Sequence, residues 1–258
     1  MSPNPAEEPP FRRIANELRA EILRGDLAPG DRIPSQDQLE QRFGASRATV
    51  RKGVAVLRME GLVTSSQGKQ ATVRRRPHVN LRQSGSIYRA RQATGEANFN
   101  AEVKAQGQIP KQVIREVVET AAPEKVADRF GIAPGAPVLV RRLTQTVDGN
   151  PMALVDGYYE LDLAADTPLA LPKLVKGGVI AFIENPDGPI GRRVVQFIED
   201  LEIRMPYPHE AGPLDIPPGV PIARVFRTAY DSAGDVLEVL DSVVPGDRHD
   251  FRYVIDVP

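Results

Sequence analysis

Residues 35–61 read SQDQLEQRFGASRATVRKGVAVLRMEG, a stretch that carries the signals of two short helices separated by a tight turn. Ser35 and Gln38 form the Ser-x-x-Gln pattern of a capping box, so a helix should begin after Ser35 and end at Gly44. Ser46, which follows almost at once, is placed to cap a second helix. Two helices joined by so short a turn predict a helix-turn-helix.

The apolar residues of this stretch recur at helical spacing. Leu39 and Phe43 give the first helix one apolar face, and Val50, Val54 and Leu57 give the second helix another. Both helices are therefore expected to pack on a common core.

A third helix is predicted upstream, in residues 11–25. Ile14, Leu18 and Ile22 recur every four residues there and form one apolar stripe. Gly25 is a plausible C-cap, because glycine readily adopts the left-handed conformation that ends many helices.

The polar face of the helix that follows Ser46 is basic at its N-terminal end. Arg47 and Arg51 lie four residues apart and share a face with Lys52, and Thr49 lies on the first turn. Such side chains can reach guanine edges, phosphates or a thymine methyl group from a helix in the major groove. If this polar face were only exposed to solvent, that would explain the arginines. It would not explain why they occur together with the helix caps and the short turn.

Beyond Gly61, in LVTSSQGKQATVRRR (62–76), the spacing of the apolar residues changes towards every second position, which is typical of strands. Residues 67–70 provide the turn of a predicted hairpin. This hairpin is a candidate wing. The arginine run at 74–76 is either a solvated linker or a further phosphate contact.

Charge is distributed unevenly along the chain. The net charge of −1 combines +5 in residues 1–77 with −6 in the remainder, and residues 42–76 hold nine basic side chains and one acid, Glu60. A basic run is often only a solvated face, but here it overlies the helix-turn-helix and indicates nucleic-acid binding.

Composition excludes several classes of site. The absence of cysteine rules out disulfides, thiolate nucleophiles and cysteine-ligated metals, and the histidines, His78, His209 and His249, are scattered singly. Neither a metal nor a cofactor is expected. Residues 1–10 lack the pattern of a signal peptide and are expected to be a disordered tail, and no apolar run is long enough for a membrane span, which favours a cytoplasmic protein.

The stretch ILRGDLAPGDRIPSQDQLEQRFGASRATVRKGVAVLRMEGLV (22–63) resembles the signature of the GntR family of bacterial transcription regulators. The resemblance implies a winged helix-turn-helix over residues 11–76 and DNA contacts from Ser35, Arg47, Thr49, Arg51, Gly68 and Lys69, the last two at a wing tip in the minor groove. Family members commonly have Gly, Thr and Phe where this chain has Gln70, Ala71 and Thr72.

The C-terminal part contains a faint internal repeat. Residues 131–159 parallel residues 215–244, and each copy reads as an antiparallel hairpin that opens with Pro-Gly-x-Pro. Each copy follows a short predicted helix, at 122–130 and 209–214, and predicted strands at 111–119 and 192–205 precede those helices. A duplicated strand-helix-hairpin unit predicts an α+β domain, with one antiparallel sheet, helices on one side and a cleft between the repeats.

After a linker at 77–95, residues 96–258 are expected to form this second domain. Residues 96–256 resemble the UTRA effector-binding domain of the HutC subfamily, which is similar in fold to chorismate lyase. The resemblance implies a ligand in the cleft, held by strand residues of both repeats and by the loop at 96–100, which includes Asn98 and Phe99. The polar strand residues expected near this pocket are Arg142, Tyr158, Glu199, Arg204, Arg227, Tyr230 and Glu238.

Strand residues alternate between the two faces of a sheet, so about half of these candidates should face away from the ligand. Many members carry a longer arginine run where this chain has Leu143 and Thr144, which makes a strongly anionic effector less well supported.

These features predict a sequence-specific transcription regulator, and more specifically a repressor. It would bind an inverted-repeat DNA operator as a homodimer, with an affinity that changes when a small molecule binds the C-terminal domain. A repressor whose C-terminal domain only dimerises is an alternative. An enzyme that acts like chorismate lyase is a weaker one, because no catalytic motif is present and likeness of fold does not establish catalysis.

Overall fold

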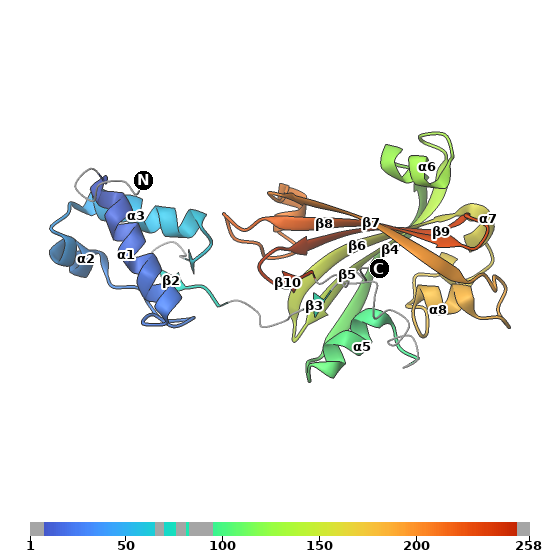
Figure 1. Cartoon of the computed structure of the whole chain (residues 1–258), viewed down its shortest axis with the longest axis horizontal. Coiled ribbons are helices and arrows are strands. Elements are labelled where there is room, and N and C mark those ends of the chain that lie inside the picture. Colours follow the sequence, from blue (N-terminus) through green and yellow to red (C-terminus); the bar gives the residue numbers. More distant parts are fainter. Residues whose placement is uncertain (1–7, 65–69, 76–80, 83–94, 252–258) are drawn as a thin grey trace, which may run out of the picture. The chain divides into compact units, whose positions relative to one another are not determined.

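The computed structural model describes residues 8–64, 70–75, 81–82 and 95–251 (Figure 1). The chain forms two compact units, the first built chiefly from residues up to Pro77 and the second chiefly from the residues that follow. The predicted tail and wing tip lie largely outside the described residues.

Three helices make up most of the N-terminal unit, and they confirm the predicted helix-turn-helix. They are α1 (Pro10–Arg24), α2 (Gln36–Phe43) and α3 (Arg47–Met59). The capping box of α2 is present: the Ser35 hydroxyl accepts from the Gln38 amide at 3.2 Å, and the Gln38 side-chain oxygen accepts from the Ser35 amide at 2.8 Å. Gly25 and Gly44 end α1 and α2 in the left-handed conformation, with φ of 85° and 58°.

The apolar stripes of these helices meet in one core. Its buried members on the helices include Ile14, Leu18, Leu39, Val50 and Leu57. Their burial fixes the rotation of each helix, and the charged face of α3 is consequently turned outward.

Two short strands extend this core. β1 (Val63–Thr64) and β2 (Thr72–Val73) pair antiparallel. The segment before α2 adds a third line of hydrogen bonds, in which the Ile33 amide donates to the Ala71 carbonyl at 3.0 Å. Gln70 donates from Nε2 to the Ile33 carbonyl at 2.6 Å and so anchors the base of the hairpin.

The C-terminal unit is built on a six-stranded antiparallel sheet in the order β4-β5-β6-β9-β8-β7. The strands are β4 (Pro110–Ala121), β5 (Pro137–Val147), β6 (Asn150–Glu160), β7 (Val194–Arg204), β8 (Ile222–Asp231) and β9 (Val236–Pro245). The helices are α5 (Asn98–Ala105), α6 (Glu124–Phe130), α7 (Leu161–Ala164), α8 (Val179–Glu184) and α9 (Pro208–Ala211), with a 3-10 turn at Pro168–Ala170. The predicted hairpins, β5-β6 and β8-β9, are confirmed.

The sheet has the pseudo-two-fold order that the sequence repeat predicts. One repeat runs β4-α6-β5-β6 and the other runs β7-α9-β8-β9, and the two join where β6 pairs with β9. Asp156 and Asp241 face each other at the centre of that five-residue ladder. The local axis therefore passes between two equivalent aspartates.

Helices cover both faces of the sheet, whereas the sequence predicted them on one side. α7 and α8 pack on the face that carries Tyr159, while α6 packs on the opposite face, which carries Tyr158. The reason is that β5 and β6 present apolar side chains in both directions, so each face needs a cover.

The predicted linker at 77–95 lies mostly outside the described residues. Within it, Leu81–Arg82 forms the short strand β3, which pairs in parallel with β10 (His249–Asp250). Part of the predicted linker is therefore attached to the C-terminal unit.

Candidate functional site

The exposed face of α3 is the first candidate site. Ser46 caps the helix by accepting from the Thr49 amide at 3.3 Å, and its hydroxyl lies 2.9 Å from that of Thr49. Arg47, Arg51 and Lys52 are all exposed on this helix. The N-terminal turns of α3 thus present three cations beside the positive end of the helix dipole, which suits an anionic partner.

The three cations differ in what holds them. Arg47 donates from Nε to the Gln36 side chain at 3.0 Å, which ties it to α2. The Lys52 ammonium lies 4.3 Å from the centre of the Phe11 ring on α1. Among the described residues Arg51 has no ion-pair or hydrogen-bond partner, so its guanidinium is the group most available to a base edge.

Close contact between α1 and α3 holds this face in position. A Cβ atom added at Gly53 would lie 2.9 Å from the Phe11 carbonyl oxygen and 3.0 Å from Cγ2 of Ile14. The two helices can approach this closely only because residue 53 has no side chain. Ser35 lies at the N-cap of α2, while Gly68 and Lys69 lie outside the described residues.

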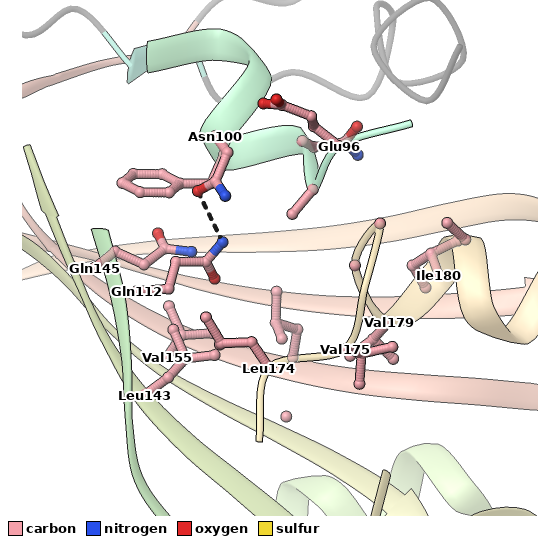
Figure 2. A pocket seen from close by; sticks show the side chains of 18 of the residues that line it. Glu96, Asn100, Gln112, Leu143, Gln145, Val155, Leu174, Val175, Val179 and Ile180 are labelled. Carbon is pink, nitrogen blue, oxygen red and sulfur yellow. Dashed lines mark hydrogen bonds between the residues drawn. The ribbon is translucent and has the colours of Figure 1, made fainter. Parts of the chain in front are cut away.

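A cavity of about 460 Å³ is the second candidate site, between the sheet, α5 and the segment that leads into α8 (Figure 2). Its apolar wall consists of Phe99, Ile114, Leu143, Val155, Leu174, Val175, Val179, Ile180 and Leu240. Its polar lining includes Asn98, Asn100, Gln112, Arg141, Gln145, Tyr159, Arg227, Glu238 and Ser242. A cavity of this size and mixed lining is typical of a small-molecule site.

Tyr159 and Glu238 form the buried polar end of the cavity. The Tyr159 hydroxyl donates to Oε1 of Glu238 at 2.6 Å, and the two residues are 1% and 6% exposed. Burial raises the pKa of Tyr159 well above its ordinary value, so the hydroxyl keeps its proton. Burial also raises the pKa of Glu238, although the Tyr159 hydrogen bond acts in the opposite direction.

Arg141 binds the backbone of the segment that leads to Leu174 in the cavity wall. Its guanidinium donates to the carbonyls of Leu169, Leu171 and Lys173, the latter two at 2.8 and 2.7 Å. Burial lowers the pKa of Arg141. The side chain lines the cavity, but the protein itself uses most of its donors.

A second arginine of the lining is also engaged. Arg227 donates from Nε to Glu199 at 2.6 Å, and its guanidinium lies 5.2 Å from the centre of the Phe197 ring. At the α5 side, Lys104 pairs with Glu96 at 2.6 Å, and Gln112 donates to Asn100 at 3.0 Å (Figure 2). The cavity is therefore polar at one end without offering an unpaired arginine.

Four of the predicted effector residues line the cavity: Asn98, Phe99, Arg227 and Glu238. The predicted loop at 96–100 is only partly a loop, since α5 begins at Asn98.

Five other predicted residues are absent from the lining. Arg142 and Tyr158 project from the opposite face, where Arg142 pairs with Asp156 and Tyr158 packs in the α6 core. Glu199 contacts Arg227 of the lining but is not itself in the lining. Arg204 forms an ion pair with Glu210. Tyr230 is partly buried outside the cavity. Arg142 and Tyr158 differ from the lining residues by strand parity, because the residues on the cavity face are their neighbours Arg141 and Tyr159.

Sequence reasoning also missed the segment from Leu174 to Ala181. Its signal was the pair Gly177-Gly178 before the apolar run of α8, and both glycines have positive φ, 77° and 93°. A Cβ at Gly178 would lie 3.2 Å from Ala97, so this glycine lets the two segments beside the cavity approach each other.

In the described part of the chain, no helix is long and apolar enough to cross a membrane. Within the same residues, no group of three acidic, histidine or cysteine side chains is placed to hold a metal ion.

Comparison with known proteins identifies both units. Residues 10–73 match the model of the bacterial regulatory proteins of the gntR family, and residues 105–250 match the UTRA domain. The fold is that of a DNA-binding regulator joined to a UTRA domain. The chain belongs to the GntR family of transcriptional regulators that carry a UTRA domain.

Individual relatives agree with this assignment. The HTH-type transcriptional repressor NagR of Bacillus subtilis is 26% identical and aligns over 96% of this chain and 95% of its own length. The HTH-type transcriptional repressor PhnF of Mycolicibacterium smegmatis is 25% identical over 92% of this chain and 91% of its own. A crystal structure assigned to the GntR-family regulators has a TM-score of 0.68 at 28% identity and covers 98% of this chain and 99% of its own.

Proposed function

We propose that this protein is a sequence-specific repressor that binds an inverted-repeat DNA operator as a homodimer. A small molecule in the cavity of the C-terminal unit changes its affinity for that operator. The protein would act in the bacterial cytoplasm, where the operator lies. Arg51 and Arg47 on α3 are the proposed base and phosphate contacts, assisted by Lys52, Thr49 and Ser35.

The observation that carries the ligand response is the cavity itself. Its polar end is built from side chains that are almost wholly buried, and its wall is apolar. A pocket with a buried polar end is costly to maintain without a function, because buried polar groups must be desolvated. A domain that only dimerises would not need it.

The lining also favours one kind of ligand. Arg141 and Arg227 are already engaged by carbonyls and by Glu199, whereas Glu238 can accept further hydrogen bonds within the cavity. We expect a compact molecule with an apolar body and hydroxyl or amine donors that approach Glu238. This agrees with the absence of an arginine run at Leu143 and Thr144.

A thermal-shift screen of metabolites, followed by operator titration, tests the proposal. A true effector should raise the melting temperature of the wild-type protein with concentration and change the affinity for DNA. Leu143→Phe, which fills part of the cavity, should abolish both effects while operator binding persists. Thr144→Val, on the same strand but the opposite face, should respond like the wild type.

A protein that binds its operator but gains no thermal stability from any compound would contradict the proposed ligand response. The C-terminal unit would then be a dimerisation domain alone.

A further inference from the structure

The first turns of α2 and α3 are joined through the side chain of Arg47. Its Nε donates to the side-chain oxygen of Gln36, the first residue of α2, at 3.0 Å. The same Nε lies 3.9 Å from Oε1 of Glu40, which is within ion-pair distance but too far for a hydrogen bond. Gln36 and Glu40 lie four residues apart on α2 and so share one face of that helix. Two acceptors on this face therefore lie beside one nitrogen of Arg47.

Glu40 and Arg47 differ in their exposure to water. Oε1 of Glu40 is buried and accepts no hydrogen bond from the described residues. A buried carboxylate oxygen is poorly shielded by water, so its charge acts strongly on the cation beside it. The Arg47 side chain is 67% exposed. Its guanidinium is therefore held at the Nε edge and open to a partner at the opposite edge.

The shape of the guanidinium determines what the open edge can bind. Arginine carries five N–H donors in one plane, and Nε supplies only one of them. In Arg47 that donor is used by Gln36, whereas neither Nη atom donates to any of the described residues. Two parallel N–H donors match the O6 and N7 acceptors of guanine in the major groove.

We propose that Gln36 and Glu40 set the base specificity of this protein by positioning Arg47, so that its two Nη atoms bind one guanine of the operator. This inference rests on the proposed operator binding and adds two specificity-determining residues on α2. Gln36 fixes the plane of the guanidinium. Glu40 keeps a DNA phosphate away from the Nε edge, because like charges repel. Arg47 makes the contact, and the two α2 residues act through it.

The test uses the full-length protein and an operator selected from a random-sequence pool. Fluorescence anisotropy measures the affinity for that operator and for versions in which each base pair of one half-site is replaced in turn. Arg47→Ala should reduce discrimination at one G·C pair at least about fivefold. Gln36→Met, which removes the acceptor but keeps the side-chain length, should reduce discrimination at the same pair about threefold to tenfold. Gln41→Met, at an exposed glutamine of α2, should match the wild type.

Two further variants separate positioning from a general structural role. Gln36→Glu keeps an acceptor at the same reach and should keep discrimination within about twofold of the wild type. Gln36→Met in the Arg47→Ala background should change nothing further, because the group that Gln36 positions is gone. Melting temperatures of all variants check that the N-terminal unit remains folded.

The contribution of Glu40 is tested against a neighbouring acid. Glu40→Ala should raise the affinity for unrelated DNA, because a negative charge is removed, and should also reduce discrimination at the G·C pair of Arg47. Asp37→Ala removes an exposed acid from the same helix without removing a partner of Arg47. It should raise the affinity for unrelated DNA but leave discrimination at that pair unchanged.

The outcomes separate this inference from the proposed function. If an operator is enriched but Gln36→Met discriminates like the wild type, the positioning role is overturned and operator binding stands. The same holds if Gln36→Met has equal effects with and without Arg47, if it weakens discrimination at every position alike, or if Arg47→Ala leaves discrimination intact. Enrichment of no sequence overturns the proposed function together with this inference.

Discussion

The hydroxyl of Tyr159 donates a 2.6 Å hydrogen bond to Glu238, which joins the two repeats at the buried end of the cavity. Tyr159 lies near the end of one hairpin strand, β6, and Glu238 lies on the neighbouring strand, β9, of the other repeat. The polar chemistry of the cavity thus arises where the duplicated halves meet.

Tyr159→Phe should destabilise the C-terminal unit by about 1–3 kcal/mol, because Glu238 loses a hydrogen bond in a buried place. Tyr158→Phe is the matched control, since Tyr158 lies next to it on the opposite face and in the α6 core. Urea denaturation followed by circular dichroism measures both. Equal losses in the two variants would show that the hydrogen bond to Glu238 contributes nothing specific.

His249 should make the protein sensitive to mild acid. Burial lowers the pKa of His249 from 6.5 to about 4. Between these pH values His249 is protonated in the unfolded chain but stays neutral in the folded chain. Above pH 6.5 this difference does not reduce the free energy of unfolding. As the pH falls from 6.5 to 4, the free energy of unfolding decreases by about 3 kcal/mol in all.

His249→Gln should accordingly lose less stability than the wild type between pH 7 and pH 5. His209→Gln, at an exposed histidine, should follow the wild type. Melting temperatures at the two pH values provide the measurement, and parallel curves for all three proteins would refute the assignment.

Arg141→Ala should loosen the segment that leads to Leu174 in the cavity wall, because three carbonyls between Leu169 and Lys173 lose their donor. Hydrogen exchange of the amides at 169–179 should accelerate at least about tenfold if local opening becomes easier by about 1.4 kcal/mol or more. Arg142→Ala, on the other face of the same strand, should leave these amides unaffected. Unchanged exchange in Arg141→Ala would contradict the role given to this residue.

Gly53→Ala should destabilise the N-terminal unit although alanine favours helices by about 1 kcal/mol over glycine. The added Cβ would lie 2.9 Å from the Phe11 carbonyl, and α1 and α3 would have to separate at a cost of about 1–3 kcal/mol. Ala48→Gly, at an exposed position of α3, measures the effect of the difference in helix propensity between alanine and glycine alone. A Gly53→Ala variant more stable than the wild type would exclude the close helix contact.

The N-terminal unit was predictable from sequence because its signals are local. Ser35, Gln38 and Gly44 act on the ends of a single helix, and each cap is within three or four residues of the group it satisfies. The hairpins of the C-terminal unit were predictable for the same reason, since alternation and turn residues lie within one copy of the repeat.

The cavity was predictable only in part, because it depends on which face of a strand turns inward. β5 is buried continuously from Val138 to Arg141, so alternation does not distinguish its two faces. Arg141 is also satisfied by carbonyls about thirty positions away in the chain. No local pattern contains that information, and the sequence therefore does not distinguish Arg141 from Arg142.

Recognition of DNA by α3 is tested by the affinity of the full-length protein for DNA fragments that it selects from a random-sequence pool. We expect an inverted repeat to be enriched. Measured by fluorescence anisotropy on that site, Arg51→Ala should weaken binding by about 1–3 kcal/mol, and Arg24→Ala, an exposed arginine at the end of α1, should change it little. Failure to enrich any sequence, or binding that Arg51→Ala leaves unchanged, would contradict the assignment of α3 as the element that reads DNA.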